Sequence, residues 1–437
     1  MIYLDHSATT PLDKRVYNKM KPYFTDDFGN ASSIHSYGQK ANNALESARG
    51  QVADFVGGNS NEIIFTSGAT ESDNLAVFGV AEKLRKDGQD LKDLHFITTS
   101  VEHPAVEEPF LKLKEQGAQV TFLPVQSNGV IDLEEIKSAI QDNTVLISIV
   151  YVNSEVGAKQ PVKEIGKIIK EERRRRSEDK AREEVVPRGR ATSDGRGATS
   201  MSEDWTKNQV ENILPLVYHT DAVQAANFFD CNVDELGVDL MSLSGHKVYG
   251  PKGVGALYVR SGTKLIGQQI GGHQENNLRS GTYNIPGVVG IGEALELTVK
   301  ERDENNKHLE KLQRKLIEGI QEKIPQAYLS TDTKVSTPSH IHFSFPGAEG
   351  EAVLLELDMD GVCVSTGSAC ASTSLKSSST LLAMGVPKEV THGAIRMTLG
   401  KNNTEEDVNK VLKILPKVIA KYRAMSPKNI DYGGTSF

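Results

Sequence analysis

The residue best suited to covalent chemistry in this chain is Lys247. It ends the run SLSGHK, at the end of a short apolar segment and among small and polar neighbours. Lysine is normally solvated, because burying an ammonium group is costly. Partial burial would lower the pKa of Lys247 and provide a neutral amine that attacks carbonyl carbons. The plainer alternative is a loop lysine whose ammonium reaches water.

Two further segments can complete a site around this lysine. Asp221 ends the run LVYHTD, and the C-terminal ends of parallel strands are where α/β sheets bind ligands. In residues 66–71 (TSGATE), small side chains precede an expected helix, so backbone N–H groups can approach a phosphate. An ordinary helix cap is the alternative there. Lysine, carboxylate and phosphate cradle are the three parts that a pyridoxal 5′-phosphate site requires.

The chain has three cysteines, and they differ in their surroundings. Cys370 lies in STGSACASTS, which lacks apolar periodicity, so we expect an exposed, mobile residue that can act as a thiolate nucleophile. Cys363 alternates with Val362 and Val364 in an expected strand and is predicted to belong to the core. Cys231 is predicted to be structural. These spacings fit neither a disulfide framework nor a zinc site, which favours a reducing cytoplasm.

The elements that must position these residues alternate along the chain. Seven short apolar runs are expected as strands, at 62–67, 95–100, 120–125, 145–152, 216–221, 240–244 and 255–260. Helical patterns lie between them, as at 39–56 and 71–86, which predicts an α/β fold with a mostly parallel seven-stranded sheet covered on both faces. A long helix is expected from about 285 to about 323, followed by short strands and helices.

Two domains and one insertion follow from this pattern. We predict a large α/β domain over 14–300, and a smaller α+β domain formed by 1–13 and 301–437 that carries the loop of Cys370. Residues 171–212 have almost no apolar side chain in their middle and are predicted to be a disordered insertion after a frayed helix end. Its arginines at 173–176 stand near acidic residues, and helical pairing would neutralise them. The alternative is a patch that binds RNA or a partner.

The composition excludes several classes of protein. With 38% apolar residues in 437, the chain has enough apolar surface for a core and is not largely disordered. No apolar run approaches the roughly 20 residues that span a bilayer, and the N-terminus lacks the apolar region of a secretory signal. A net charge of −8 argues against sequence-independent nucleic-acid binding. We therefore expect a cytoplasmic protein without membrane or direct nucleic-acid partners.

Taken together, six motifs resemble those of the cysteine desulfurases, which are pyridoxal-phosphate enzymes of aminotransferase class V and fold type I. They are YLDHSATTP at 3–11, FTSGATESDN at 65–74, SVEHPAV at 100–106, SLSGHKVYGPKG at 242–253, RSGT at 279–282 and STGSAC at 365–370. The resemblance covers nearly the whole chain except 171–212 and the extreme C-terminus. The segment around Cys370, with its long Ser/Thr-rich continuation, resembles the group I enzymes.

The resemblance implies a role for each matching residue. Lys247 would form the Schiff base with the cofactor and remove the Cα proton, Asp221 would pair with the pyridinium nitrogen, and His103 would stack over the ring and shuttle protons. Cys370 would accept sulfur from L-cysteine, which leaves L-alanine and an enzyme-bound persulfide. The remaining implied contacts are Ala69, Thr70, Ser244 and His246 to the phosphate, Thr282 to the phosphate from the neighbouring subunit of a homodimer, Gln224 and Ser154 near the ring oxygen, and Asn153 and Arg396 to the substrate.

Several of these residues have plainer alternatives. His103 can simply cap the helix that starts at Pro104, Arg396 can pair with a surface acid, and Thr282 can be an ordinary turn residue. Ser154 stands where the family usually has a second asparagine, so a hydroxyl, or a water bound to it, would face the ring oxygen. No metal site is predicted.

Alternatives also stand for the function as a whole. A selenocysteine lyase or another class V aminotransferase would share the cofactor site, but a transaminase has no need of Cys370. A non-catalytic sulfur-relay or assembly protein is the second alternative. The sulfur acceptor of a desulfurase would be an iron–sulfur scaffold or a tRNA-thiolation enzyme.

Overall fold

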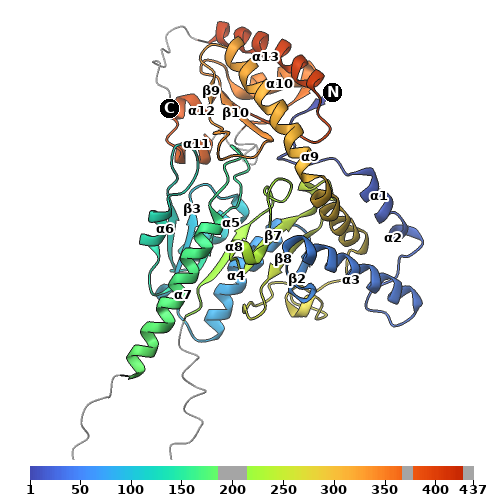
Figure 1. Cartoon of the computed structure of the whole chain (residues 1–437), viewed down its shortest axis with the longest axis vertical. Coiled ribbons are helices and arrows are strands. Elements are labelled where there is room, and N and C mark those ends of the chain that lie inside the picture. The colour runs from blue at the N-terminus through green and yellow to red at the C-terminus, as the bar shows by residue number, and fades with distance from the viewer. Residues whose placement is uncertain (186–213, 367–376, 427–437) are drawn as a thin grey trace, which may run out of the picture.

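The computed structural model describes residues 1–185, 214–366 and 377–426. Two packed regions are joined by one long helix, α9 (Ile285–Lys323), which runs from the larger region into the smaller one (Figure 1). The sequence predicted this helix with the same bounds. Among the described helices, none is both long and apolar enough to cross a membrane.

A seven-stranded sheet forms the centre of the larger region. Its order in space is β2 (Ile63–Thr66), β8 (Gly255–Val259), β7 (Leu240–Ser244), β6 (Val217–Asp221), β5 (Thr144–Ser148), β3 (His95–Thr99) and β4 (Gln119–Leu123). β8 runs antiparallel to both of its neighbours, and the other pairs in this sheet are parallel. The predicted mostly parallel seven-stranded sheet is therefore confirmed.

Helices cover both faces of this sheet. Because successive side chains of a strand point to opposite faces, Phe65 and Ile97 belong to one core and their neighbours Ile64 and Phe96 to another. The first core also takes side chains from α3 (Ser36–Val56), α6 (Leu133–Ala139), α7 (Val162–Val185), α8 (Val233–Leu236) and the first half of α9. The second is formed with α4 (Ala69–Lys86) and α5 (Pro104–Glu115).

The smaller region has its own core. β10 (His340–Ser344) lies between β9 (Tyr328–Leu329) and β12 (Ala394–Thr398), antiparallel to both. β1 (Ile2–Tyr3) pairs in parallel with β11 (Val362–Cys363), which brings the N-terminus into this region. The second half of α9, α10 (Gly350–Met359) and α13 (Glu405–Met425) complete the packing. The domain boundaries at 13/14 and 300/301 stay a prediction.

Four shorter helices complete the described fold: α1 (Lys14–Met20), α2 (Pro22–Thr25), α11 (Ser379–Ala383) and α12 (Lys388–Thr391). α1 and α2 follow the N-terminal segment and pack against α9. This packing fixes the segment between β1 and α1, which matters for the site described below.

Helix α7 contains the start of the predicted insertion and projects from the larger region (Figure 1, green). The predicted neutralisation of its arginines is confirmed by ion pairs of Arg175 and Arg176 with Glu172 at 2.8 and 2.9 Å. Arg173 pairs instead with Asp239, beside β7. The remainder of the insertion, from 186 to 212, lies outside the described residues.

The structure corrects one of the cysteine predictions. Cys231 is fully buried, as expected for a structural residue. Cys363, predicted to be in the core, is half-buried, because Val362 and Val364 occupy the core-facing positions of this alternating segment. Its thiol lies 3.4 Å from a carboxylate oxygen of Asp358.

Candidate active site

A cavity of about 690 Å³ lies at the C-terminal edge of the seven-stranded sheet. The segments after β2, β3, β5, β6 and β7 all line it, because these parallel strands end at the same edge. The cavity has the size of a cofactor site. Its wall includes these predicted site residues: Ala69, Thr70, His103, Ser154, Asp221, Gln224, Ser244, His246, Lys247 and Arg396.

The predicted phosphate cradle lies at the start of α4. Ala69 is the first helical residue and Gly68 the N-cap, so the orphan N–H groups of the first turn face the cavity. Close approach of β8 requires a glycine at 255, because a β-carbon there would lie 2.7 Å from the backbone of Gly68. Glu71 anchors the turn by accepting from the Ser67 N–H at 2.7 Å. This arrangement suits an anion.

Asp221 lies at the end of β6, deep in the cavity, and is 5% exposed. One carboxylate oxygen accepts a hydrogen bond from the Val223 N–H at 2.9 Å. Burial raises the pKa of the Asp221 carboxyl, and the charges of His103 and Lys247 oppose that rise. A cationic N–H group bound in the cavity would further favour the ionised carboxylate.

Lys247 ends a short 3₁₀ turn, Gly245–Lys247, directly after β7. Its ammonium group donates to the backbone carbonyl of Ala8 at 2.8 Å and to that of Ser7. Its own carbonyl accepts from the side-chain amide of Asn227. The side chain is half-buried and lines the cavity, so it is not a loop lysine in open solvent.

The two histidines of the site have defined hydrogen bonds. His103 is the N-cap of α5, and its Nδ1 accepts from the Ala105 N–H at 3.1 Å. The capping alternative is thus correct as a contact, yet the same ring lines the cavity. His246 Nδ1 lies 3.1 Å from the Thr9 hydroxyl. Burial lowers the pKa of His246 to about 4, and Lys247 adds to this effect, so the ring is neutral at pH 7.

Arg396 enters the cavity from β12 of the smaller region. Its side chain is 8% exposed, and Nη2 lies 2.8 Å from the carboxylate of Asp5. Nη1 donates to the backbone carbonyl of Ser154 at 3.1 Å. The alternative of an ion pair with an acid is therefore correct as a contact, but the Asp5 side chain is only 20% exposed and Arg396 itself lines the cavity. A guanidinium held in this way is suited to binding a carboxylate.

Two predicted residues of the described chain, Asn153 and Thr282, do not line this cavity. The Asn153 side-chain oxygen accepts from two backbone N–H groups, of Glu155 and Val156, and its NH₂ group donates to the Val101 carbonyl at 3.0 Å. Asn153 is thus a turn-forming residue outside the cavity wall, which corrects its prediction as a substrate ligand. Thr282 is exposed and does not line the cavity. Cys370 lies outside the described residues.

An N-terminal strap, defined as residues 5–10, crosses the site. The sequence did not predict its contacts with the site residues. Its backbone carbonyl at Ser7 accepts from the Gln224 amide at 2.9 Å, and the Ser7 hydroxyl donates to the Ser154 carbonyl at 2.7 Å. The strap also supplies Asp5 and Thr9 to the contacts above. The motif YLDHSATTP marked this segment, but its sequence distance from its partners concealed the contacts.

A second buried carboxyl group, that of Asp73 on α4, lines the same cavity and was also missed. Burial raises the pKa of Asp73 well above its usual range, and the charge of Asp221 adds to the rise. Both carboxyl groups are therefore harder to ionise than an aspartate in water, and the positive charges of His103 and Lys247 favour ionisation of Asp221.

These residues fit pyridoxal 5′-phosphate as a bound group. The helix N-terminus at Ala69 and Thr70 suits its phosphate, Asp221 suits its ring nitrogen, and Lys247 suits its aldehyde. All of them line one cavity of adequate volume.

Comparisons with known proteins agree with this chemistry. The model of the aminotransferase class-V family matches residues 2–177 and 206–411. The cysteine desulfurase IscS of Dictyoglomus turgidum is 43% identical over 426 residues, which cover 98% of this chain and 96% of that protein. The cysteine desulfurase IscS of Methanosarcina thermophila is also 43% identical, over 98% of this chain and 94% of that protein.

Solved structures show the same relationship. A NifS-like protein superposes with a TM-score of 0.80 at 35% identity, covering 96% of this chain and 99% of its own. SspA in complex with cysteine superposes with a TM-score of 0.71 at 31% identity, covering 92% of this chain and 100% of its own. The chain therefore belongs to the aminotransferase class-V family and, within it, to the cysteine desulfurases.

Proposed function

We propose that this protein converts L-cysteine to L-alanine and transfers the sulfur to Cys370 as a persulfide, with pyridoxal 5′-phosphate as its cofactor. The observation that carries the proposal is the convergence of Lys247, Asp221, the helix N-terminus at Ala69 and the guanidinium of Arg396 on one cavity. Family membership agrees with the reaction.

The cofactor contacts are assigned by chemistry. Ala69, Thr70, Ser244 and His246 would hold the phosphate, and Asp221 would pair with the ring nitrogen. His103 would stack on the ring, while Gln224 and Ser154 would interact with the ring oxygen. When bound, pyridoxal 5′-phosphate supplies an electron sink that stabilises negative charge at the substrate Cα.

The chain's own residues perform the remaining steps. Arg396 binds the substrate carboxylate, which places the Cα–H bond next to the Lys247 amine. Lys247 removes the Cα proton, and Lys247 and His103 carry protons within the site. The Cys370 thiolate then attacks the substrate sulfur: an S–S bond forms and the C–S bond breaks. The carbon retains the C–S electron pair and takes up a proton, which yields alanine.

The partners of the reaction are also part of the proposal. Thr282 lies outside its own cavity and is exposed, which suits a contact with the phosphate in the neighbouring subunit of a homodimer. The persulfide passes to an acceptor protein, either an iron–sulfur scaffold or a tRNA-thiolation enzyme. The reaction takes place in the cytoplasm.

The test is to incubate the purified holoenzyme with L-cysteine, L-selenocysteine or L-alanine plus an α-keto acid, and to quantify the products. We expect alanine and sulfide from cysteine in the presence of a thiol reductant. Alanine from selenocysteine with none from cysteine would favour a selenocysteine lyase, and amino-group transfer would favour an aminotransferase. No turnover of any substrate by the cofactor-loaded protein would favour a non-catalytic relay protein.

A further inference from the structure

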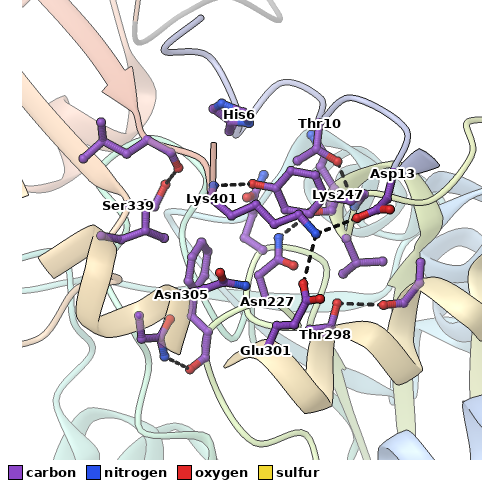
Figure 2. Close-up of a pocket in the computed structure, with 18 of the residues that line it drawn as sticks. His6, Thr10, Asp13, Asn227, Lys247, Thr298, Glu301, Asn305, Ser339 and Lys401 are labelled. Atoms are coloured by element: carbon purple, nitrogen blue, oxygen red, sulfur yellow. Dashed lines mark hydrogen bonds and ion pairs between the residues drawn. The ribbon is translucent and has the colours of Figure 1, made fainter. Parts of the chain in front are cut away.

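A second, smaller cavity of about 30 Å³ also has Lys247 in its wall (Figure 2). Lys247 lines both cavities, so the contacts around the smaller one determine how the lysine turn is held. Tyr249, two residues after Lys247, also lines it. The proposed function assigns no role to these contacts.

The backbone at Tyr249 is in a conformation that side chains other than glycine rarely adopt, with φ at 60°. Such conformations persist only where the surroundings hold them. Here the Tyr249 N–H donates to the Thr10 hydroxyl at 2.8 Å, and the Tyr249 carbonyl accepts from the Asp13 N–H at 3.0 Å. The Thr10 hydroxyl also donates to the His246 carbonyl at 2.9 Å. Thr10 therefore contacts the residue before Lys247 and the second residue after it.

The side chain of Tyr249 connects this turn to the smaller region. Its hydroxyl accepts from the backbone N–H of Lys401 at 2.8 Å, and the Lys401 ammonium lies 4.5 Å from the centre of its ring. Tyr249 is 9% exposed. Removing the hydroxyl would leave a backbone N–H without its partner, which costs more than the loss of an exposed hydrogen bond.

Lys401 is itself held from two sides. Its ammonium lies between Asp13 and Glu301, at 2.8 and 3.2 Å, and its side chain is 14% exposed (Figure 2). Asp13 precedes α1, and Glu301 is on α9. Lys401 therefore joins the smaller region to the N-terminal segment and to the long helix at one point.

Lys401 follows the strand that carries Arg396, because β12 ends at Thr398. The turn of Lys247 and the guanidinium of Arg396 are thus connected through Tyr249, Lys401 and one strand end. The amine and the guanidinium must meet the same small substrate, and misplacement of either by about 1 Å costs up to about 100-fold in rate.

We propose that Tyr249 and Lys401 are positioning residues that fix the turn of Lys247 relative to β12, so that the Lys247 amine and the Arg396 guanidinium address one substrate molecule. This inference rests on the proposed function, and it adds a role for residues that touch neither substrate nor cofactor.

The first test is Tyr249→Phe, which deletes one oxygen. We expect the holoenzyme to keep its cofactor, kcat for alanine formation from L-cysteine to fall about 10-fold, and KM to stay within about two-fold. We also expect the pH midpoint of the cofactor's visible absorbance, measured without substrate, to move by about half a pH unit or more. That midpoint reports the surroundings of Lys247 without any turnover.

The matched control is Tyr218→Phe, because Tyr218 is also buried and its hydroxyl also makes one hydrogen bond to the backbone, donating to the Val162 carbonyl at 3.1 Å. It lies outside both cavities. We expect it to lower thermal stability as much as Tyr249→Phe does, with kcat and the absorbance midpoint unchanged. Equal effects of the two variants on kcat and midpoint would overturn the proposal.

The second test is Lys401→Met with Lys401→Arg. Asp13 and Glu301 both also pair with Arg15, at 2.8 and 2.5 Å, so neither carboxylate loses its last partner in Lys401→Met. We expect Lys401→Met to lower kcat about five-fold or more, and Lys401→Arg to restore most of it. If Tyr249→Phe does not fold, the two Lys401 variants test the proposal on their own. An unchanged kcat and an unchanged absorbance midpoint in Lys401→Met would then contradict it. The two proposals can also fail separately. If the wild type does not desulfurate cysteine, but the absorbance midpoint still shifts in Tyr249→Phe and Lys401→Met, the positioning role is supported and the proposed function is refuted.

Discussion

Arg396, which lines the candidate active site, forms an ion pair with Asp5, with 2.8 Å between Nη2 and the carboxylate oxygen. They are 391 positions apart in the sequence. β12 carries the arginine and the N-terminal strap carries the aspartate. The protein itself thus orients the guanidinium, and the Nε–H group of Arg396 is buried without a hydrogen-bond partner in the described structure.

Arg396→Lys is expected to raise KM for L-cysteine about 10-fold or more with a smaller change in kcat. Lysine keeps the charge but loses the planar fork that binds a carboxylate through two parallel hydrogen bonds. Steady-state kinetics of alanine formation measure this. Arg423→Lys is the matched control, since Arg423 also donates to backbone carbonyls, of Pro346 and Pro325, but outside the cavity. A KM unchanged in Arg396→Lys would show that the substrate carboxylate binds elsewhere.

Asp221→Asn is expected to lower kcat by about 100-fold or more while the cofactor stays bound. The amide has nearly the same shape but cannot pair as an anion with a protonated ring nitrogen, so the electron sink is weakened. Alanine formation and visible absorbance are measured together. Asp239→Asn serves as the control, because Asp239 is also buried but lies outside the cavity. Equal activities of the two variants would contradict the role of Asp221.

Glu102→Gln is expected to gain stability relative to the wild type as the pH rises from 6 to 8. Burial raises the pKa of Glu102 to about 8, while its carboxylate oxygen accepts from the Val150 N–H at 2.9 Å. The pKa of Glu102 is higher in the folded protein than in the unfolded chain, so its protonated form stabilises the fold. This stabilisation is complete below the pKa of the unfolded chain and is lost as the pH rises toward 8. Glutamine accepts the same hydrogen bond and does not ionise.

Urea unfolding at pH 6 and pH 8 measures this difference in the free energy of unfolding. We expect it to change by on the order of 2 kcal/mol in favour of Glu102→Gln. The control, Glu115→Gln, replaces an exposed glutamate at the end of α5 and should show no such change. Parallel pH dependences of the wild type and Glu102→Gln would contradict the prediction.

Deleting residues 186–205 is expected to leave alanine formation from L-cysteine within about two-fold of the wild type. The family model matches residues up to 177 and again from 206, so this segment lies between the matched parts. The deletion retains Arg173 and Arg176, which donate to the carbonyls of Leu216 and Thr144 at 2.9 Å. A large loss of activity with an unchanged melting temperature would assign the segment a catalytic role.

Much of the site was predictable because its chemistry lies where strands end. Small residues before an expected helix identified the cradle at Ala69, and the abrupt ends of two apolar runs identified Asp221 and Lys247. The position of such residues in a parallel sheet follows from topology, and the structure brings them to one cavity.

The rest depended on tertiary contacts that no local pattern encodes. Asn153 looked like a ligand beside Ser154, yet a tight turn uses its amide for backbone hydrogen bonds. The contact of Asp5 with Arg396 requires the N-terminus to pair beside β12, through a bridge between Asp5 and Thr398. Tyr249 and Lys401 meet only because two separately packed regions touch at that point.

Mass spectrometry of the protein after L-cysteine is added to the wild type, Cys370→Ala and Lys247→Ala locates the transferred sulfur. We expect a persulfide at Cys370 with a matching yield of alanine in the wild type. In Cys370→Ala we expect a bound cofactor and no persulfide, and in Lys247→Ala we expect neither product. A persulfide that forms equally at Cys231 or Cys363 in Cys370→Ala, or alanine produced by Lys247→Ala at the wild-type rate, would refute the proposed roles of Cys370 and Lys247.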